Sequence, residues 1–395
     1  MTIKNALGRT GLPYKNALVG IGYGWARAKS CCIFHLRMVY LAKTLLLPMA
    51  CAVAHNSKRT PRGWTTREGA MQEVYENIYL IKLPLPENPL KDLNSYFIKG
   101  SGGGRNLLID TGFNHPQTEA ALMGAWEALG ARLEETDILI THAHSDHSGL
   151  AGKLKNAYNT VYCSSRDGVL LHDYVGEHYW VELVKQQRFM GFPYPFLHTD
   201  HPGYCWKDSI QHERKNIDPG DRLSVGGYTF EVIDLAGHTP GQIGLYEKKH
   251  RLLFCGDHLL QKITPNLKFW SLDYDSLAVY LRNVEKLAQL PVDHLFSAHR
   301  ELIPDIKERV GEMLQHHEKR LAWTLEIIAE GPCDTWAVAS GITWDYQGGD
   351  FTKFAPPQQW FAANETFVHL QHLFSTRRDI KRQAVGEVFF FSIHA

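Results

Sequence analysis

Four side chains that commonly bind metal ions lie within six positions of one segment. The stretch Thr141–Gly149 carries His142, His144, Asp146 and His147, and the apolar run that precedes it, 137–141, predicts a buried strand. Side chains two positions apart on an extended backbone point the same way, so His142 and His144 can bind one ion. Asp146 and His147, beyond the bend, can bind a second. Imidazole and carboxylate ligands suit Zn²⁺ or a similar ion. A histidine-rich surface loop is the alternative, which this spacing disfavours.

The pattern His142-x-His144-x-Asp146-His147 resembles the signature of the metallo-β-lactamase superfamily. That signature calls for further ligands, each at the end of a later strand. The sequence has His238 in a Gly-His-Thr-Pro-Gly turn, Asp257 after the apolar run 252–256, and His299 after 295–298. An Asp-Thr-Gly turn at 110–112, also usual in the superfamily, is expected to orient the metal loop from behind.

The resemblance implies two divalent ions, expected to be Zn²⁺ with iron or manganese as alternatives. His142, His144 and His238 should hold the first ion. Asp146, His147 and His299 should hold the second, and Asp257 should bridge the two. Two such ions lower the pKa of a shared water, so the expected nucleophile is a metal-bridging hydroxide. Asp146 is the expected catalytic residue, orienting this hydroxide and carrying its proton.

The residue at the bridging position narrows the substrate class. Two of the three β-lactamase subclasses carry Cys there, whereas this chain has Asp257 and places Cys255 in the expected core. The Asp form resembles glyoxalase II-like thioesterases, lactonases and phosphodiesterases. We therefore predict hydrolysis of a thioester or related ester, as by a hydroxyacylglutathione hydrolase, with a small-molecule acyl substrate. A metal-dependent endoribonuclease or phosphodiesterase and a mononuclear iron persulfide dioxygenase are the alternatives. A non-catalytic binding protein is disfavoured, because the complete ligand set would serve no purpose without chemistry.

The charge of the chain is unevenly distributed. Its 395 residues carry no net charge, but residues 1–67 contain eleven Lys and Arg and no Asp or Glu. The remainder has 31 basic and 42 acidic residues, a balance that counts against nucleic acid as a partner. The seven cysteines form no CxxC pair, which favours a reducing, cytoplasmic setting.

Residues 1–70 are expected to be a leader that is disordered, serves targeting or is not native. Their apolar run, 39–54, follows basic residues but is interrupted by Lys43 and Pro48. It is too short and too broken to predict a membrane span. The superfamily-like sequence begins at Met71, so the catalytic domain is expected to cover 71–302.

The order of expected elements favours an α/β (α+β) fold, a four-layer αββα sandwich with the metal site along one edge. Strands are expected at 78–83, 94–98, 106–109, 137–141 and 160–164, and helices at 116–129, from Leu150 and at 276–290. An aromatic-rich insertion, 172–216, lies between the first and second groups of ligands. We predict that it forms a lid over the substrate pocket, with Tyr179, Trp180, Phe192 and His201 as candidate substrate-binding residues. Simple packing of a small lid is the alternative.

The last part of the chain, 303–395, is expected to form a separate module. Helices are predicted at 305–330, 335–340 and 358–374, followed by a hairpin at 380–392. This order resembles the winged-helix tail of some superfamily members, including a lactamase-like endoribonuclease branch. Arg377, Arg378, Lys381 and Arg382 lie where a wing would be, so nucleic-acid contact is one interpretation. Support for the active-site edge, or a homodimer contact, is the other. Only 41 residues separate Asp257 from His299, so the β-CASP insertion of RNA-processing relatives is missing.

Overall fold

The computed structural model describes residues 65–66 and 69–394, which belong to one compact unit. Most of the predicted leader, including the apolar run 39–54, lies outside the described residues. Two short strands begin within its last six positions, β1 (Thr65–Thr66) and β2 (Gly69–Tyr75). Within the described residues, no helix is both long enough and apolar enough to cross a membrane.

The first sheet contains eight strands in sequence order. Neighbouring strands are antiparallel from β1 to β5 and parallel from β5 to β8. After β2 they are β3 (Ile78–Pro84), β4 (Asp92–Ile98), β5 (Asn106–Ile109), β6 (Thr136–Leu139), β7 (Val161–Cys163) and β8 (Lys215–Asn216). The parallel pair β5 and β6 needs a crossover connection, which α1 (Pro116–Leu129) and the short helix η1 (Leu133–Glu135) provide.

The second sheet contains five strands in the order β13-β12-β11-β10-β9. They are β9 (Arg222–Val225), β10 (Tyr228–Asp234), β11 (Ile243–Glu247), β12 (Leu252–Gly256) and β13 (His294–Ser297). β12 and β13 are parallel, and α7 (Ser276–Gln289) connects them. The Asp275 side chain caps α7 by accepting a hydrogen bond from the Ala278 amide.

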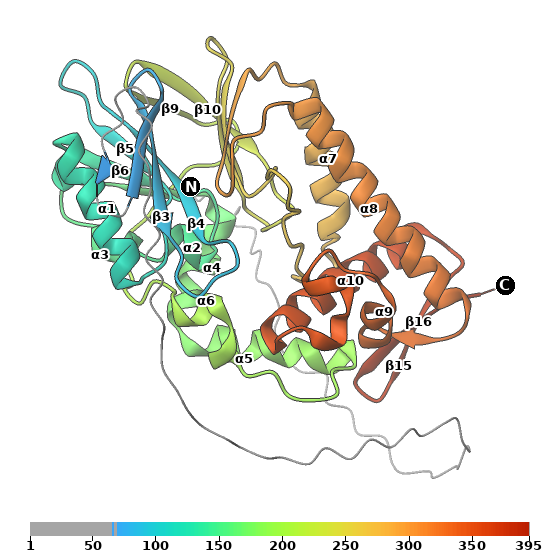
Figure 1. Cartoon of the computed structure of the whole chain (residues 1–395). Helices are drawn as coiled ribbons and strands as arrows, with labels where there is room; N and C mark the ends of the chain where they lie inside the picture. Colours follow the sequence, from blue (N-terminus) through green and yellow to red (C-terminus); the bar gives the residue numbers. More distant parts are fainter. Residues whose placement is uncertain (1–64, 67–68, 395) are drawn as a thin grey trace, which may run out of the picture. The chain divides into compact units, whose positions relative to one another are not determined.

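Three layers of buried side chains show how the sheets and helices stack. Between the sheets, Tyr96 of the first packs against Phe254 of the second, with ring centroids 5.1 Å apart. Leu122 and Trp126 of α1 cover the outer face of the first sheet. Leu277, Tyr280, Val284 and Leu287, the apolar face predicted for 276–290, cover the second. The predicted αββα sandwich is therefore confirmed (Figure 1).

The insertion is helical. It begins in the last turn of α4 (Ser165–Val175) and contains α5 (Glu177–Lys185), η2 (Gln186–Met190), η3 (His198–Asp200) and α6 (Pro202–Cys205). Earlier in the chain, the helix expected from Leu150 consists of only four residues, α3 (Ala151–Leu154). It ends at Lys155, whose extended backbone cannot continue the helix.

The C-terminal segment has the predicted order of helices and hairpin, with one further strand. It contains α8 (Ile306–Ala329), β14 (Cys333–Asp334), α9 (Thr335–Gly341), η4 (Gln347–Gly349), η5 (Phe351–Lys353), α10 (Pro356–Thr376), β15 (Ile380–Val385) and β16 (Val388–Ile393). β14 pairs with β16 to make a three-stranded sheet. Tyr280 of α7, Met313 of α8 and Phe367 of α10 share one hydrophobic core. The helices of this segment therefore pack directly on the sandwich (Figure 1).

Candidate metal centre

The loop after β6 carries the first four candidate ligands. His142 and His144 lie in the loop itself, and Asp146 and His147 lie in α2 (Ser145–Ser148), one turn of helix. His142 and His147 are fully buried, whereas His144 and Asp146 are partly exposed. His144 and Asp146 therefore mark the side of the centre that solvent reaches.

The three later candidates each follow a strand of the second sheet. His238 lies between β10 and β11, Asp257 follows β12 directly, and His299 comes two residues after β13. The backbone conformation and the space around residue 256 both require a glycine before Asp257. Gly256 has φ +52°, and a Cβ there would lie 2.9 Å from the Thr141 Oγ1. A larger residue would push the strand end away from the metal loop.

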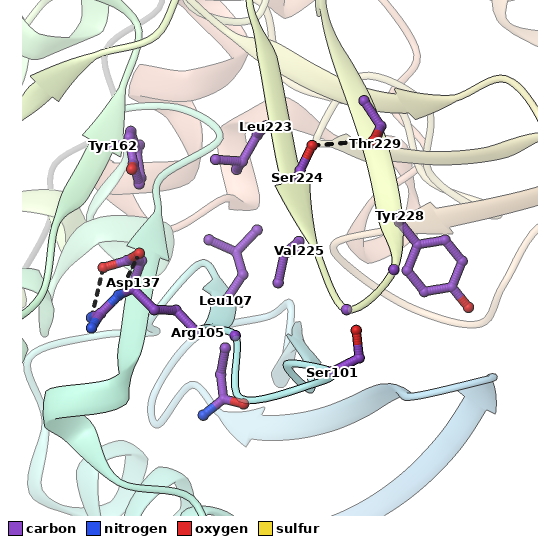
Figure 2. Close-up of a pocket in the computed structure, with 14 residues that line it drawn as sticks. Ser101, Arg105, Leu107, Asp137, Tyr162, Leu223, Ser224, Val225, Tyr228 and Thr229 are labelled. Carbon is purple, nitrogen blue, oxygen red and sulfur yellow. Dashed lines mark hydrogen bonds and ion pairs between the residues drawn. The ribbon is translucent and has the colours of Figure 1, made fainter.

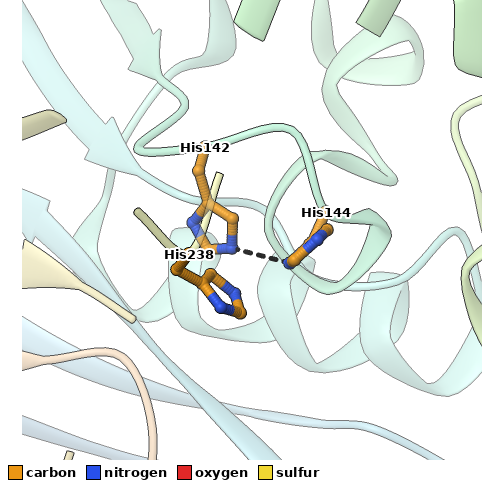
Figure 3. Close-up of side chains that lie close together, drawn as sticks. All are labelled: His142, His144 and His238. Atoms are coloured by element: carbon orange, nitrogen blue, oxygen red, sulfur yellow. Dashed lines mark hydrogen bonds between the residues drawn. The ribbon is translucent and has the colours of Figure 1, made fainter. Parts of the chain in front are cut away.

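One group of ligands consists of His142, His144 and His238, whose imidazole rings face one another (Figure 3). His142 Nε2 lies 3.2 Å from His144 Nδ1. The ring centroids of His144 and His238 are 4.5 Å apart. One ring nitrogen from each of the three lies within 4.8 Å of the others, close enough for one ion to contact all three.

A second group consists of Asp146, His147 and His299. His299 Nε2 lies 3.4 Å from Asp146 Oδ2, and His147 Nε2 lies 3.8 Å from the same oxygen. Asp257 stands between the groups. Its Oδ1 is 3.5 Å from His147 Nε2, and its Oδ2 is 3.6 Å from His238 Nε2. One carboxylate thus reaches both halves of the centre.

The second nitrogen of three histidine rings is held by an oxygen acceptor. The Nδ1 atoms of His238 and His299 donate to the backbone carbonyls of Asn266 and Asp92, each at 2.8 Å. The Nδ1 of His147 donates to Asp110 Oδ2 at 2.7 Å. Such bonds fix the ring and leave Nε2 as the atom that can bind a metal.

Four ligand atoms that face the interior of the centre have no hydrogen-bond partner. This holds, within the described residues, for Nε2 of His147, His238 and His299 and for Oδ1 of Asp257. A buried polar atom left without a partner costs about 1–3 kcal/mol. Divalent cations would satisfy all four atoms at once, so the residues present fit metal ions.

The Asp110 turn supports the metal loop from behind, as predicted. Asp110 Oδ1 accepts the Thr141 amide at 2.8 Å, and its Oδ2 accepts the Thr141 hydroxyl at 2.8 Å as well as the His147 ring. Thr111 donates from its amide and its hydroxyl to the His147 carbonyl, at 2.7 and 3.0 Å. Asp110 acts through His147 and through the backbone of the loop.

Asp167 is a supporting residue that the sequence did not reveal. It is buried, and it accepts hydrogen bonds from the Ala143 amide at 2.8 Å, the Thr239 hydroxyl at 2.7 Å and the Gly241 amide at 2.8 Å. It therefore ties the loop of His142 and His144 to the turn of His238. Burial raises the pKa of Asp167 to about 6, although these hydrogen bonds oppose the rise. In the sequence, the spacing of Asp167 from Ser164, which caps α4, predicts the start of a helix and does not predict this supporting role.

A further unforeseen support comes from the C-terminal helix. The Asn266 carbonyl accepts from His238. The Asn266 side chain donates to the Phe361 carbonyl at 3.2 Å and to Glu365 Oε2 at 3.3 Å. α10 therefore holds the residue that orients a candidate ligand, and no sequence motif marks this contact.

The carboxylates of the centre are ionised, and the charges of its histidines depend on one another. Burial, and then the charge of His147, lower the pKa of His142. Burial opposes protonation of His147, but the charges of Asp110 and Asp257 outweigh it and raise the pKa of that ring. Burial would raise the pKa of the Asp257 carboxyl, but His299 and His147 lower it well below its usual range. Ionised carboxylates therefore surround a centre that a cation would neutralise.

The family of the chain follows from this site and one comparison. The model of the metallo-beta-lactamase superfamily matches residues 90–299, a range that contains all seven candidate ligands. The chain belongs to the metallo-β-lactamase superfamily. Its members are metal-dependent hydrolases, as predicted from the motif.

Relatives of known name share parts of the sequence. Hydroxyacylglutathione hydrolase GloC of Haemophilus influenzae is 31% identical over 165 residues, 40% of this chain and 68% of that protein. The probable metallo-hydrolase YqjP of Bacillus subtilis is 21% identical over 287 residues, 68% of this chain and 85% of that protein. A metallo-beta-lactamase family protein of Thermus thermophilus has a similar structure, with a TM-score of 0.70, 24% identity and coverage of 82% of this chain and 100% of its own. The shared fold therefore extends beyond residues 90–299.

The four candidate substrate-binding residues lie in different surroundings. Trp180 is buried, and its Nε1 donates to the Tyr174 carbonyl at 2.8 Å. His201 caps α6 through Nδ1 and packs on Trp180, while Phe192 packs on Trp336 of α9, with centroids 4.9 Å apart. Tyr179 accepts a hydrogen bond from Lys268. A substrate-binding role for these residues stays a prediction.

A cleft of about 440 Å³ lies apart from the candidate ligands (Figure 2). It is lined by the segment leading into β5 and by the β9–β10 hairpin, and none of the seven ligands borders it. Its charged residues, Arg105 and Asp137, pair with each other at 2.9 Å. This cleft therefore contains none of the candidate metal-binding residues.

Proposed function

We propose that the centre holds two Zn²⁺ ions. His142, His144 and His238 would bind the first, and Asp146, His147 and His299 the second, with Asp257 between them. The convergence of these seven side chains, with interior atoms that lack partners, carries the proposal. Imidazole and carboxylate ligands in this number match a two-ion catalytic site.

The proposed reaction is hydrolysis of a thioester or a related ester. When bound, the ions would supply a water of lowered pKa and would polarise the acyl carbonyl. The Asp146 Oδ2 is the atom placed to hold and move a proton, because it belongs to a partly exposed carboxylate within 3.8 Å of two candidate ligands. Hydrogen bonds donated by the His147 and His238 rings to Asp110 and to the Asn266 carbonyl keep these candidate ligands oriented.

The substrate class rests on the bridging residue and on one relative. Asp257 at the bridging position is the form seen in glyoxalase II-like thioesterases. The relative GloC is named for hydrolysis of hydroxyacylglutathione, which is a thioester. An RNA substrate has less support from the structure. Arg377 pairs with Asp379 at 2.6 Å, and Arg382 stacks over Phe374 and Phe389, so two of the four basic tail residues are already engaged.

A substrate panel tests this function. Thioesters, lactones, β-lactams, phosphodiesters and RNA are each incubated with zinc-loaded protein, and thiol release, ring opening or strand cleavage is measured. We expect thioesters to give the highest kcat/KM and His142→Ala to abolish turnover. Cleavage of RNA with inert thioesters would overturn the proposal. A parallel assay of iron-loaded protein with a persulfide substrate covers the alternative, and oxygen uptake with one iron per chain would instead support the persulfide dioxygenase.

A further inference from the structure

Two buried histidines join the two long helices of the C-terminal segment. His317 of α8 is 0% exposed and His369 of α10 is 1% exposed. Their rings stack with centroids 5.3 Å apart, and His317 Nδ1 lies 3.1 Å from His369 Nε2. Neither ring belongs to the groups of candidate metal ligands. The proposed metal chemistry therefore does not account for this pair.

The hydrogen bonds of the pair determine where its protons lie. His369 Nδ1 lies 2.7 Å from the Glu365 backbone carbonyl, which can only accept, so this nitrogen carries the proton of the ring. His369 Nε2 is then the bare nitrogen, and it accepts a hydrogen bond from His317 Nδ1. The remaining nitrogen, His317 Nε2, is buried and has no hydrogen-bond partner among the described residues. Both rings are therefore neutral in this arrangement.

The pair has no place for a further proton. A proton on His369 Nε2 would face the N–H of His317 and would break the hydrogen bond between the rings. A proton on His317 Nε2 would create a buried cation whose new N–H has no acceptor, which is costly. Burial accordingly lowers the pKa of His369 to about 4 and lowers the pKa of His317 well below its usual value. The two helices thus meet through a contact that only neutral rings can make.

The charged groups around the pair offer little compensation for an added proton. On α8 and α10, Glu365 Oε1 lies 3.8 Å from Arg320 Nε and 3.7 Å from His316 Nε2, so this carboxylate already has two basic partners. From α7, the Tyr280 phenol packs against the pair, with ring centroids 5.5 Å apart. In the loop after α9, the exposed Asp345 acts on Arg320. A positive charge on the pair would therefore be repelled by Arg320.

The same turn of α10 is connected to the metal centre. Glu365, whose backbone carbonyl accepts from the His369 ring, also accepts a hydrogen bond from the Asn266 side chain at 3.3 Å. The Asn266 side chain donates as well to the Phe361 carbonyl, one turn earlier in α10, at 3.2 Å. The Asn266 carbonyl accepts from the His238 ring at 2.8 Å. A displacement of α10 would therefore release the residue that orients a candidate ligand.

We propose that His317 and His369 form an acid-sensitive latch between α8 and α10, which opens when either ring is protonated and then loosens the contact of Asn266 with His238. The latch itself does not depend on the proposed function, whereas its effect on zinc does. The closed form binds fewer protons than the open form, so acid favours opening. With a pKa of about 4 in the closed chain and about 6.5 in the open one, His369 alone should raise the open population about 30-fold between pH 7.5 and pH 5.

Hydrogen exchange of the α10 amides in zinc-loaded protein tests the latch. Exchange rates at pH 7.5 and pH 5 are each divided by the rate of an unstructured chain at the same pH, which gives the protection of each segment. In the wild type, the protection of α10 should fall by about 30-fold or more on acidification. The double variant His317→Gln, His369→Gln has no ring to protonate and should show a fall of less than about threefold. An equal fall in the wild type and the double variant would overturn the latch.

Further variants keep the test decisive. If the double variant fails to fold, His317→Gln or His369→Gln alone should show a smaller fall than the wild type, and an undiminished fall in both would overturn the latch. His172→Gln, on the exposed side of α4, is the matched control and should respond to pH as the wild type does.

Zinc retention in the same samples tests the connection to the metal centre. On acidification, the wild type should lose zinc at a higher pH than the double variant. If α10 responds to acid as expected but both proteins lose zinc at the same pH, the connection through Asn266 would be overturned. If neither protein binds zinc at pH 7.5, the proposed function would be overturned, and the exchange of α10 would still decide the latch.

Discussion

Replacing Asp110 with Asn should weaken metal binding without disturbing the backbone. Asp110 has φ +61°, a conformation that Asn tolerates as well as Asp, so the turn should remain. The carboxylate accepts three hydrogen bonds, from the Thr141 amide, the Thr141 hydroxyl and the His147 ring. An amide has one acceptor oxygen and one donor nitrogen. Whichever way it turns, at least one of these donors faces an NH₂ group.

The expected loss of metal affinity follows from the hydrogen bond to Asp110 that the His147 ring loses. Removing a hydrogen-bonded partner of a metal-binding histidine typically costs 10- to 100-fold in metal affinity or activity, or about 1.4–2.7 kcal/mol. We expect this loss for the ion that His147 would bind, measured by zinc titration against a competing chelator. Asp173→Asn, on the exposed side of α4, is the control. A folded Asp110→Asn protein with wild-type zinc affinity would refute the argument that this turn orients His147.

Two further predictions concern the C-terminal helices. Glu365→Gln should lower the free energy of unfolding by about 3 kcal/mol and weaken zinc binding, because Glu365 lies 3.8 Å from buried Arg320 and accepts from Asn266. Thermal unfolding with and without zinc measures both effects. In the control Glu312→Gln, the replaced carboxylate is exposed and pairs with Arg309, so the change should cost less than about 1 kcal/mol. If the two variants are equally stable, the buried pair has no special role. His369 is buried, and burial lowers its pKa from 6.5 to about 4. The native chain therefore binds fewer protons than the unfolded chain in this range, so stability should fall by about 3 kcal/mol as the pH drops from 6.5 to 4. Urea unfolding of chelator-treated protein at both pH values should show a smaller drop for His369→Gln, and an unchanged drop would contradict the assignment.

The set of candidate ligands that the fold brings together was predictable because each candidate lies next to a local signal. His142 and His144 follow a short apolar strand, and Asp257 follows another, so the family signature could be found segment by segment. The αββα sandwich could be predicted from the same resemblance and from the alternation of strands and helices in the sequence. The Asp110 turn was predictable for the same reason, since its three residues are contiguous.

The supporting contacts were not predictable, because they join segments that are far apart in the chain. Asp167 accepts from Ala143 and from Gly241, 74 positions away, and nothing near it in sequence indicates those partners. Asn266 contacts Glu365 across 99 positions. β14 is only two residues long, too short for any alternation to reveal it. Lys268 is flanked by apolar residues, and only the fold places it beside Tyr179, 89 positions away.

The central claim is that seven side chains hold two divalent ions, and metal analysis of the purified chain tests it most directly. Inductively coupled plasma mass spectrometry should find about two divalent ions per wild-type chain. It should find about one in a variant that lacks His142 and His144, and turnover should disappear with chelation. A wild-type chain that takes up no divalent ion, or a variant that keeps both, would contradict the account.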